Sequence, residues 1–326
     1  EILLANMKEE YINKKNYSIF SSLLYENINQ TLANHKQVIL FKNQRGYASN
    51  IRCEVCGWVA KCPNCDVSLT YHKHLNTLNC HYCGLNLPLY NECPECHSHS
   101  LIQSGNGSEK IEEETQRFFP NARIKRMDLD TTRKKNDYLE IIQDFEKGNI
   151  DILCGTQIIT KGLDFSNVGL VGVIDADSLL YYPDFRAYER CFDLLTQVAG
   201  RAGRLKEKGA VVIQSFNPNH QIFKEVLNYD YASMYKNQIV ERKLFSYPPF
   251  VYLTKILFQS KDKDVLDSLC QEYSNEIRKI FAQRILGPEY PPIYRVKGMY
   301  QKQFILKLEK TISYTQYFHF YFPPDL

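Results

Sequence analysis

Four Cys-x-x-Cys pairs lie within residues 53–96 of this 326-residue sequence. They read CEVC, CPNC, CHYC and CPEC, and the two intervening residues let both thiolates of a pair reach one metal ion from a single tight turn. The three remaining cysteines, Cys154, Cys191 and Cys270, are scattered singly. A disulfide framework has no need of such regular spacing, so the pattern predicts metal binding by thiolates.

The eight paired thiols are sufficient for two tetrahedral zinc sites, because structural zinc is held by four ligands. Fourteen residues separate Cys65 from Cys80, a spacing close to that of zinc ribbons, whereas only five separate Cys56 from Cys62. We therefore expect a nested arrangement rather than a pairing of neighbouring motifs. The inner site would be formed by Cys62, Cys65, Cys80 and Cys83, and the outer site by Cys53, Cys56, Cys93 and Cys96.

Both sites are expected to be structural, because four sulfur ligands leave no open position for catalysis. An insert of this size has too little hydrophobic core to fold alone, and each structural zinc contributes roughly 10–16 kcal/mol in model peptides. Five histidines accompany the cysteines, and we expect surface residues rather than spare ligands. They are His72, His74, His81, His97 and His99.

The cysteine-rich stretch carries more negative than positive charge. It contains two Lys against four Asp or Glu, and each zinc ion with four thiolates adds further negative charge. Such a surface binds phosphate poorly. Its aromatic residues, Trp58, Tyr71, Tyr82 and Tyr90, are able either to stack on unpaired bases or to pack on a protein partner. We favour a rigid structural and partner-docking module, with a DNA-reading finger as the alternative.

The flanking sequence alternates short apolar runs with helical patterns. Strands are predicted at 37–41, 122–128, 151–156, 168–177 and 210–216, and helices at 19–32, 109–119, 138–148 and 185–204. Alternation with short connections indicates an α/β fold with a right-handed parallel sheet. The cysteine block follows the first of these strands and is therefore an insertion in the sheet domain.

These patterns predict the domain organisation. Residues 1–18, polar and rich in Lys and Asn, are expected to be a linker, and 19–218 to form the sheet domain, interrupted by the zinc-binding insert at 50–100. Residues 219–326 predict a small α+β domain. The net charge is only +3, and no run approaches the roughly 20 apolar residues of a membrane span, so we expect a cytoplasmic protein. The initial Glu suggests that the chain is part of something longer.

Two segments of the sheet domain suggest phosphate chemistry. GTQIITKGLDF, residues 155–165, follows a strand, and QVAGRAGR, residues 197–204, ends a helix. Arg201 and Arg204 are three residues apart and share one helical face. Two planar, permanently charged guanidinium groups suit a triphosphate. The alternative is a basic helix end that neutralises its own dipole.

These two segments resemble motif V and motif VI of superfamily 2 helicases. Together with the cysteine pairs, LFKNQRGYA, GNGSE, DADSLLYYPDFRAYER and ERKLFSYPPF, they resemble the PriA family of replication-restart primosomal helicases over residues 40–250. A looser match, VKGMYQKQFILKL, extends the resemblance to about residue 308. The resemblance implies a RecA-like helicase lobe in an ATP-dependent 3′–5′ DNA helicase that recognises stalled or branched forks and initiates primosome assembly.

The same resemblance implies roles for individual residues. Gly162 and Asp164 would lie beside the nucleotide, with Gln197, Arg201 and Arg204 facing its phosphates and Thr156 near the DNA backbone. The family also has the nested zinc pairing. The implied cofactors are two zinc ions and, in the complete enzyme, ATP with Mg²⁺. The implied partners are branched and single-stranded DNA, primosome proteins, the single-strand-binding protein and the N-terminal half of the helicase, at the nucleoid.

The sequence contains no G-x-x-x-x-G-K-[ST] loop and no Asp-Glu pair of Walker B type. We therefore expect the second helicase lobe, its zinc insert and the C-terminal domain without the first lobe, as a fragment or a disrupted reading frame, inactive as an ATPase by itself. The alternative is a non-catalytic zinc scaffold that docks primosome proteins or DNA. The ending after Lys310 is shorter than in the family, which puts docking of the single-strand-binding protein in doubt.

The C-terminal domain contains a basic and aromatic segment. Between 284 and 310 there are six Lys or Arg against two Asp or Glu, with tyrosines interleaved. Basic groups for phosphates and rings for bases predict a branched-DNA surface at Arg295, Lys297 and Lys302. A solvated face over an aromatic core is the alternative.

Overall fold

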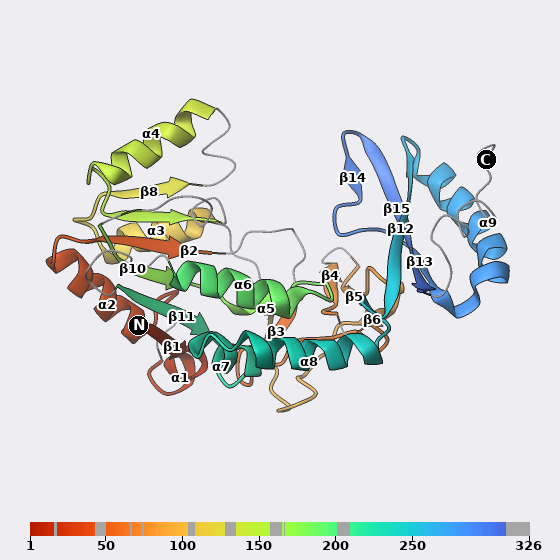
Figure 1. The fold of residues 1–326 in the computed structure, drawn as a ribbon, viewed down its shortest axis with the longest axis horizontal. Coiled ribbons are helices and arrows are strands. Elements are labelled where there is room, and N and C mark those ends of the chain that lie inside the picture. Colours follow the sequence, from red (N-terminus) through yellow and green to blue (C-terminus); the bar gives the residue numbers. More distant parts are fainter. Residues whose placement is uncertain are drawn as a thin grey trace.

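The computed structural model describes residues 1–15, 18–42, 50–65, 67–72, 75–103, 108–127, 135–156, 165, 167–200 and 209–310. Its largest element is a six-stranded sheet in the order β1-β11-β10-β2-β9-β8, in which all neighbouring strands are parallel (Figure 1). The strands are β1 (Ile2–Asn6), β2 (Gln37–Phe41), β8 (Ile124–Met127), β9 (Ile152–Gly155), β10 (Val168–Val173) and β11 (Ala210–Ser215). The predicted parallel α/β fold is confirmed.

The sheet is buried on both faces, and this explains why its strands read as continuous apolar runs rather than alternating ones. In β2 every residue is buried. Ile39 and Phe41 belong to one core, whereas Val38 and Leu40 belong to the core on the opposite face. Successive side chains of a strand point to opposite faces, so one run of five residues serves both cores.

Helices form the two covering layers. The helices α2 (Ser22–Ala33) and α3 (Ser108–Phe118) cover one face, and α4 (Lys135–Glu146), α5 (Asp177–Leu180), α6 (Ala187–Ala199) and α7 (Gln221–Leu227) pack in the core of the other. Ser21 begins α2 by accepting the Leu24 amide at its hydroxyl oxygen, as expected of an N-cap. Among the described residues, no helix combines the length and the apolarity that crossing a bilayer requires.

The prediction that residues 1–18 form a linker is wrong for most of that segment. Ile2–Asn6 forms the edge strand β1, paired with β11, and α1 (Met7–Ile12) follows it. The Glu1 carbonyl accepts the Val211 amide at 2.8 Å, and Leu4 packs against the core. The polar composition of residues 1–18 as a whole concealed the strand, because the strand itself is only five residues long. The predicted strand 168–177 also ends early, since Asp177 begins α5.

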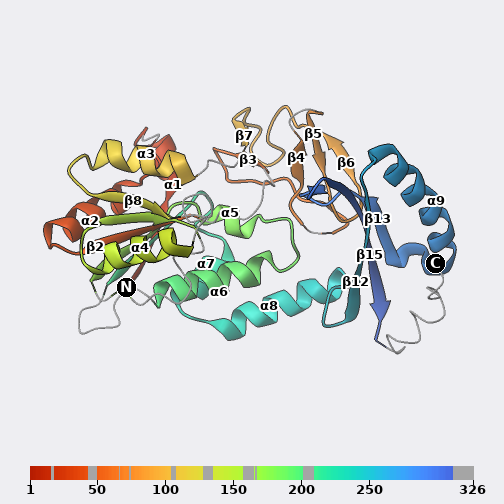
Figure 2. The ribbon, with the colours of Figure 1, turned by 90° about the horizontal axis from the view of Figure 1, so that it is seen from above.

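The cysteine-rich insert forms small antiparallel sheets. The pair β3 (Ile51–Cys53) and β7 (Leu101–Gln103) lies at its base, and β4 (Thr70–His72), β5 (Thr77–Asn79) and β6 (Asn86–Pro88) form a three-stranded sheet. In both views the insert lies between the parallel sheet and the C-terminal domain (Figures 1 and 2). The insert therefore has contact with both parts of the molecule.

The long helix α8 (Tyr231–Leu244) leads to the C-terminal domain, which is α+β as predicted. The predicted boundary at residue 219 is too early, because α7 and Met234 of α8 pack in the core of the sheet domain. The four-stranded antiparallel sheet contains β12 (Val251–Ser260), β13 (Ile285–Glu289), β14 (Arg295–Val296) and β15 (Met299–Glu309). Helix α9 (Lys263–Phe281) contributes Leu266, Cys270 and Ile277 to the core beneath it. This domain has its own core and contacts the insert, and its Lys307 ammonium group also donates to the Phe245 carbonyl at the end of α8 at 2.7 Å.

We expect Gly172→Ala to lower the free energy of unfolding by about 1–3 kcal/mol, because overpacking a filled core forces neighbouring side chains to move. A Cβ at Gly172 would lie 2.9 Å from methyl groups of both Leu24 and Leu40. Urea unfolding checks the value. Gly200→Ala is the control, since among the described residues the atom nearest to a Cβ there would be the Thr196 carbonyl oxygen, at 3.5 Å. Equal stabilities of the two variants would contradict this packing.

Candidate metal centres and the carboxyl edge of the sheet

The structure gathers the eight paired cysteines into two clusters. The outer cluster contains Cys53, Cys56, Cys93 and Cys96, and the inner cluster Cys62, Cys65, Cys80 and Cys83. Within each cluster the Sγ atoms all lie within 4.8 Å of one another. The nested pairing predicted from the spacing is thus the one that the fold assembles, and the pairing of neighbouring motifs is wrong.

The sulfur separations fit a tetrahedral zinc ion. The Sγ atoms of Cys53 and Cys96 are 3.6 Å apart, and those of Cys56 and Cys93 are 3.4 Å apart. In the inner cluster, the Cys62 and Cys83 sulfurs are also 3.6 Å apart. Zinc–sulfur bonds of about 2.3 Å place tetrahedral ligands a little under 4 Å from one another. The donor set of each cluster therefore fits a structural Cys₄ zinc site.

Local backbone geometry explains why two of the pairs, Cys53–Cys56 and Cys80–Cys83, form tight turns (knuckles) around the metal position. Gly57 and Gly84 follow the second cysteine of their pairs at φ of 80° and 79°, where a glycine avoids the strain of a side chain. Each donates its amide to the carbonyl of the first cysteine, at 3.0 and 2.9 Å. The Trp58 amide bonds the Cys56 sulfur, and the Ser98 backbone lowers the pKa of Cys96 to about 7. These amides favour the thiolate form that binds metal.

The prediction that these histidines lie at the surface is correct for His97 and His99, only partly correct for half-buried His72, and wrong for His81. His97 is exposed, and the ring of exposed His99 contacts the Asn91 carbonyl. His81 is only 4% exposed, and its Nδ1 lies 2.6 Å from the Tyr290 carbonyl of the C-terminal domain. Burial lowers the pKa of His81 to about 4, so its ring is neutral at pH 7. His74 lies outside the described residues.

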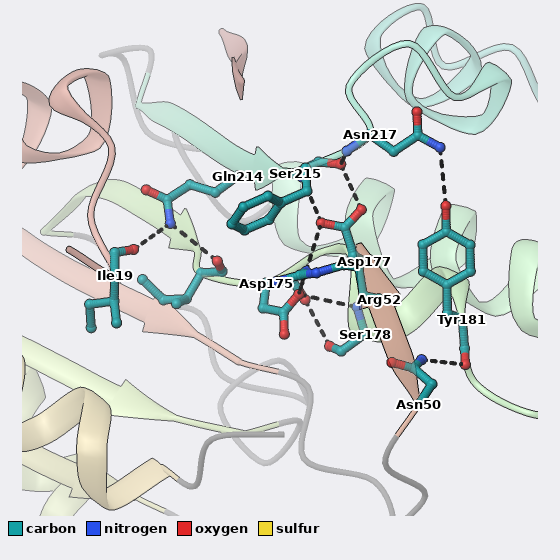
Figure 3. A network of polar contacts seen from close by, with 12 residues as sticks. Ile19, Asn50, Arg52, Asp175, Asp177, Ser178, Tyr181, Gln214, Ser215 and Asn217 are labelled. Atoms are coloured by element: carbon teal, nitrogen blue, oxygen red, sulfur yellow. Dashed lines mark hydrogen bonds and ion pairs between the residues drawn. The ribbon is translucent and has the colours of Figure 1, made fainter. Parts of the chain in front are cut away.

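A buried polar network fastens the insert to the carboxyl edge of the parallel sheet (Figure 3). Asp177 follows β10 and accepts hydrogen bonds from the Ser215 hydroxyl at 2.8 Å and the Phe216 amide at 2.7 Å, both at the end of β11. Arg52, on β3 of the insert, places its Nη1 atom 3.6 Å from Asp177 and 3.8 Å from Asp175. Its guanidinium also lies 3.9 Å from the centre of the Phe216 ring.

Electrostatics explain why this arginine is needed. Asp177 is fully buried, and burial raises the pKa of its carboxyl group, whereas the nearby Arg52 charge lowers that pKa. Sequence reasoning missed Arg52 because it precedes the first cysteine by one residue and has no motif of its own. The DAD segment that contains Asp175 and Asp177 was noted only for its resemblance to helicases. The pairing of Arg52 with these two carboxylates could be recognised only from the tertiary structure.

The predicted nucleotide residues lie partly outside the described residues, namely Gly162, Asp164, Arg201 and Arg204. Gln197 is exposed in the last turn of α6. Thr156 is 7% exposed and immediately follows β9, at the carboxyl edge of the sheet. In open α/β sheets this edge is the usual position of ligand sites. The predicted roles of these residues stay predictions.

The predicted DNA contacts differ in their surroundings. Arg295 and Lys297 are exposed in the β14–β15 hairpin, and the Arg295 guanidinium lies 4.9 Å from the centre of the Tyr300 ring. Lys302 forms an ion pair with Asp267 at 2.6 Å, and its side chain is only 15% exposed. The DNA contact of Lys302 stays a prediction, but this ammonium group already has a structural partner.

Comparisons with known proteins match the same parts of the chain. Family models match at residues 62–88 (PriA DNA helicase Cys-rich region domain), 97–206 (helicase conserved C-terminal domain) and 243–317 (primosomal protein N C-terminal domain). The replication restart protein PriA of Bacillus subtilis (strain 168) is 41% identical over 312 residues, which are 95% of this chain and 39% of that protein. The chain belongs to the PriA family.

Other PriA proteins match to a similar extent. PriA of Borreliella burgdorferi is 37% identical over 96% of this chain and 46% of its own length, and PriA of Thermotoga maritima is 34% identical over 91% and 40%. The chain thus spans about two fifths of the length of the PriA proteins it matches. Among solved structures, the yeast DEAD-box splicing factor Prp28 covers 76% of this chain and 36% of its own at 13% identity, with a TM-score of 0.35. At that score the fold assignment depends on the sheet order and the PriA matches instead.

We expect the purified chain to contain two zinc ions and Cys62→Ser to contain one, because the substitution removes a ligand from the inner cluster alone. Inductively coupled plasma mass spectrometry checks the stoichiometry. Cys270→Ser is the matched control, since this buried cysteine lies on α9 away from both clusters and should leave two ions in place. A wild-type chain without zinc would contradict the assignment.

Proposed function

We propose that this chain acts as part of an ATP-dependent 3′–5′ DNA helicase that recognises stalled or branched replication forks and initiates primosome assembly in the cytoplasm, at the nucleoid. The observation that carries the proposal is a parallel sheet of helicase type joined, through two Cys₄ clusters, to a PriA-type C-terminal domain. The Cys₄ clusters supply structure rather than catalysis, because four thiolates fill the coordination of each zinc ion.

The chain would provide the arginine half of the ATPase site. Helix α6 positions Gln197 at its end, directly before the segment with Arg201 and Arg204. In this proposal the two guanidinium groups face the triphosphate and stabilise charge that develops on the γ-phosphate, and Gly162 and Asp164 lie beside the nucleotide. ATP and Mg²⁺ would be held mainly by a P-loop and a Walker B carboxylate, which this sequence does not contain.

DNA would be contacted at two places. Thr156 at the end of β9 would face the DNA backbone, as the resemblance to motif V implies. In the C-terminal domain, the β14–β15 hairpin turns at Lys297 and Gly298, whose φ angles of 50° and 81° give the tight turn that suits a two-residue loop. Exposed Tyr294 stacks on Tyr300 with an interplanar angle of 16°. Such rings beside exposed cations suit unpaired bases and phosphates.

The second candidate function is a non-catalytic zinc scaffold that docks primosome proteins or DNA. Exposed aromatic residues on α8, Tyr231 at 59% and Tyr235 at 52%, favour a protein partner there. Primosome proteins and the single-strand-binding protein are the partners that the family implies. The arginines distinguish the two functions, because a scaffold has no need of Arg201 and Arg204.

We expect the purified chain alone to release no phosphate from ATP, with or without DNA, since it has no P-loop to hold the β- and γ-phosphates. A coupled phosphate-release assay checks this. Adding in trans the region of Bacillus subtilis PriA that precedes the matched stretch should give turnover that Arg204→Lys abolishes. Turnover by the chain alone, or turnover unaffected by the substitution, would refute the half-site proposal.

We expect the combined substitution of Arg295→Ala and Lys297→Ala to weaken binding of single-stranded DNA and to flatten its salt dependence. The slope of log K against log salt is negative, and each lost phosphate contact reduces its magnitude by about 0.7. Fluorescence anisotropy over a salt series measures the slope. Lys279→Ala, on the exposed end of α9, is the control, and Lys302→Ala separately tests that predicted contact. An unchanged slope in the double variant would favour a merely solvated face.

A further inference from the structure

We propose that the two cysteine clusters join different parts of the molecule: the inner cluster holds the C-terminal domain against the helicase lobe, whereas the outer cluster anchors the insert to the lobe alone. The inference rests on the proposed occupancy of both clusters by zinc. It assigns a separate mechanical role to each ion, although the two sites have the same ligands. The evidence for this inference is the set of contacts that each cluster makes with the rest of the molecule.

The outer cluster packs on the carboxyl edge of the parallel sheet. A Cβ at Gly57 would lie 3.0 Å from the Phe216 carbonyl oxygen, so the Cys53–Cys56 knuckle approaches the end of β11 as closely as backbone allows. Arg52, the residue before this knuckle, lies between Asp177 and the Phe216 ring. Cys56 also lines a surface cavity together with Asn217 and residues of α1. These contacts all belong to the helicase lobe.

The inner cluster presents its backbone to the C-terminal domain. The Cys65 carbonyl accepts the Tyr247 hydroxyl at 2.7 Å, and the His81 carbonyl accepts the Gln303 side-chain amide at 2.9 Å. The His81 Nδ1 atom lies 2.6 Å from the Tyr290 carbonyl. A Cβ at Gly84 would lie 2.8 Å from the Glu289 carboxylate. The Cys62–Cys65 knuckle therefore contacts Tyr247, just before the C-terminal domain, and the Cys80–Cys83 knuckle contacts the sheet of that domain.

Tyr247 extends this contact to the helicase lobe. Its ring stacks on Phe185 at a centroid distance of 4.6 Å and an interplanar angle of 11°. Phe185 lies two residues before α6, the helix that leads to the predicted ATP-site arginines. On β15, the Lys307 ammonium lies 4.3 Å from the centre of the Tyr247 ring. One buried tyrosine thus joins the inner zinc knuckle, the lobe and the C-terminal sheet.

The proposed roles follow from what zinc does to a knuckle. The metal fixes the turn, and the turn fixes the direction of the Cys65 and His81 carbonyls. Without the inner ion these carbonyls lose their orientation, so Tyr247 and Gln303 lose the hydrogen bonds that they donate to them. Lys61 lies between Cys56 and Cys62 in the sequence and donates to the Tyr188 hydroxyl of α6 at 2.7 Å, which keeps the segment that connects the two clusters on the lobe in either case.

The test compares Cys83→Ser in the inner cluster with Cys96→Ser in the outer cluster, both ligands being partly exposed. Zinc content and small-angle X-ray scattering of the full chain are measured. We expect each variant to lose one of two ions, and only Cys83→Ser to have a larger radius of gyration than wild type, as its C-terminal domain undocks. Equal expansion of both variants, or none in Cys83→Ser, would overturn the inference.

Two substitutions that spare the ligands keep the test decisive if a cysteine variant fails to fold. Tyr247→Phe removes only the hydroxyl bonded to the Cys65 carbonyl, and Gln303→Leu only the amide bonded to His81. The double variant should retain two zinc ions and expand, whereas Arg52→Gln, at the outer contact, should not expand. If Arg52→Gln expanded and the double variant did not, the inference would be overturned. A wild-type chain without zinc counts against the proposed metal sites, whereas two ions with no difference among variants counts against this inference alone.

Discussion

The fit of four thiolates around each of two metal positions is the constraint on which the rest of the structure depends. The insert consists of three-residue strands and turns, with a small core shared among the cysteines and a few aliphatic side chains. A core of that size does not offset the chain entropy of ordering it. The two cysteine clusters fit zinc sites, and metal–thiolate bonds there would supply the missing stability.

The insert is attached to the sheet by charge, through the contacts of Arg52 with Asp175 and Asp177. Asp177 is buried at the end of β10, where an isolated carboxylate would be costly to desolvate. Two hydrogen bonds from the end of β11 and the guanidinium of Arg52 stabilise its charge. Because Arg52 comes from the insert, the helicase lobe is electrostatically complete only when the insert is docked. The two parts are therefore interdependent even though an insertion can in principle be separate from its host.

The sequence was sufficient to predict the strands that are buried on both faces, the helices that cover them and the pairing of the cysteines. It failed where the signal was short or came from elsewhere in the chain. The edge strand Ile2–Asn6 lies in a segment whose overall polarity predicts a linker. His81 looked like a surface residue because nothing local reveals that the C-terminal sheet covers it. No local pattern indicated the ion pair between Lys302 and Asp267, because the two residues are 35 positions apart in the sequence.

By itself, the sequence determined the chemistry: eight thiols at knuckle spacing, a parallel α/β pattern and the motifs of a PriA-type lobe. These are local properties, set by spacing and periodicity along the chain. Only the tertiary structure decided which parts the two clusters contact, that Arg52 compensates Asp177, and that Tyr247 lies between a knuckle carbonyl and the Phe185 ring. Such contacts join residues far apart in the sequence, and their energies depend on burial and orientation that no local pattern encodes.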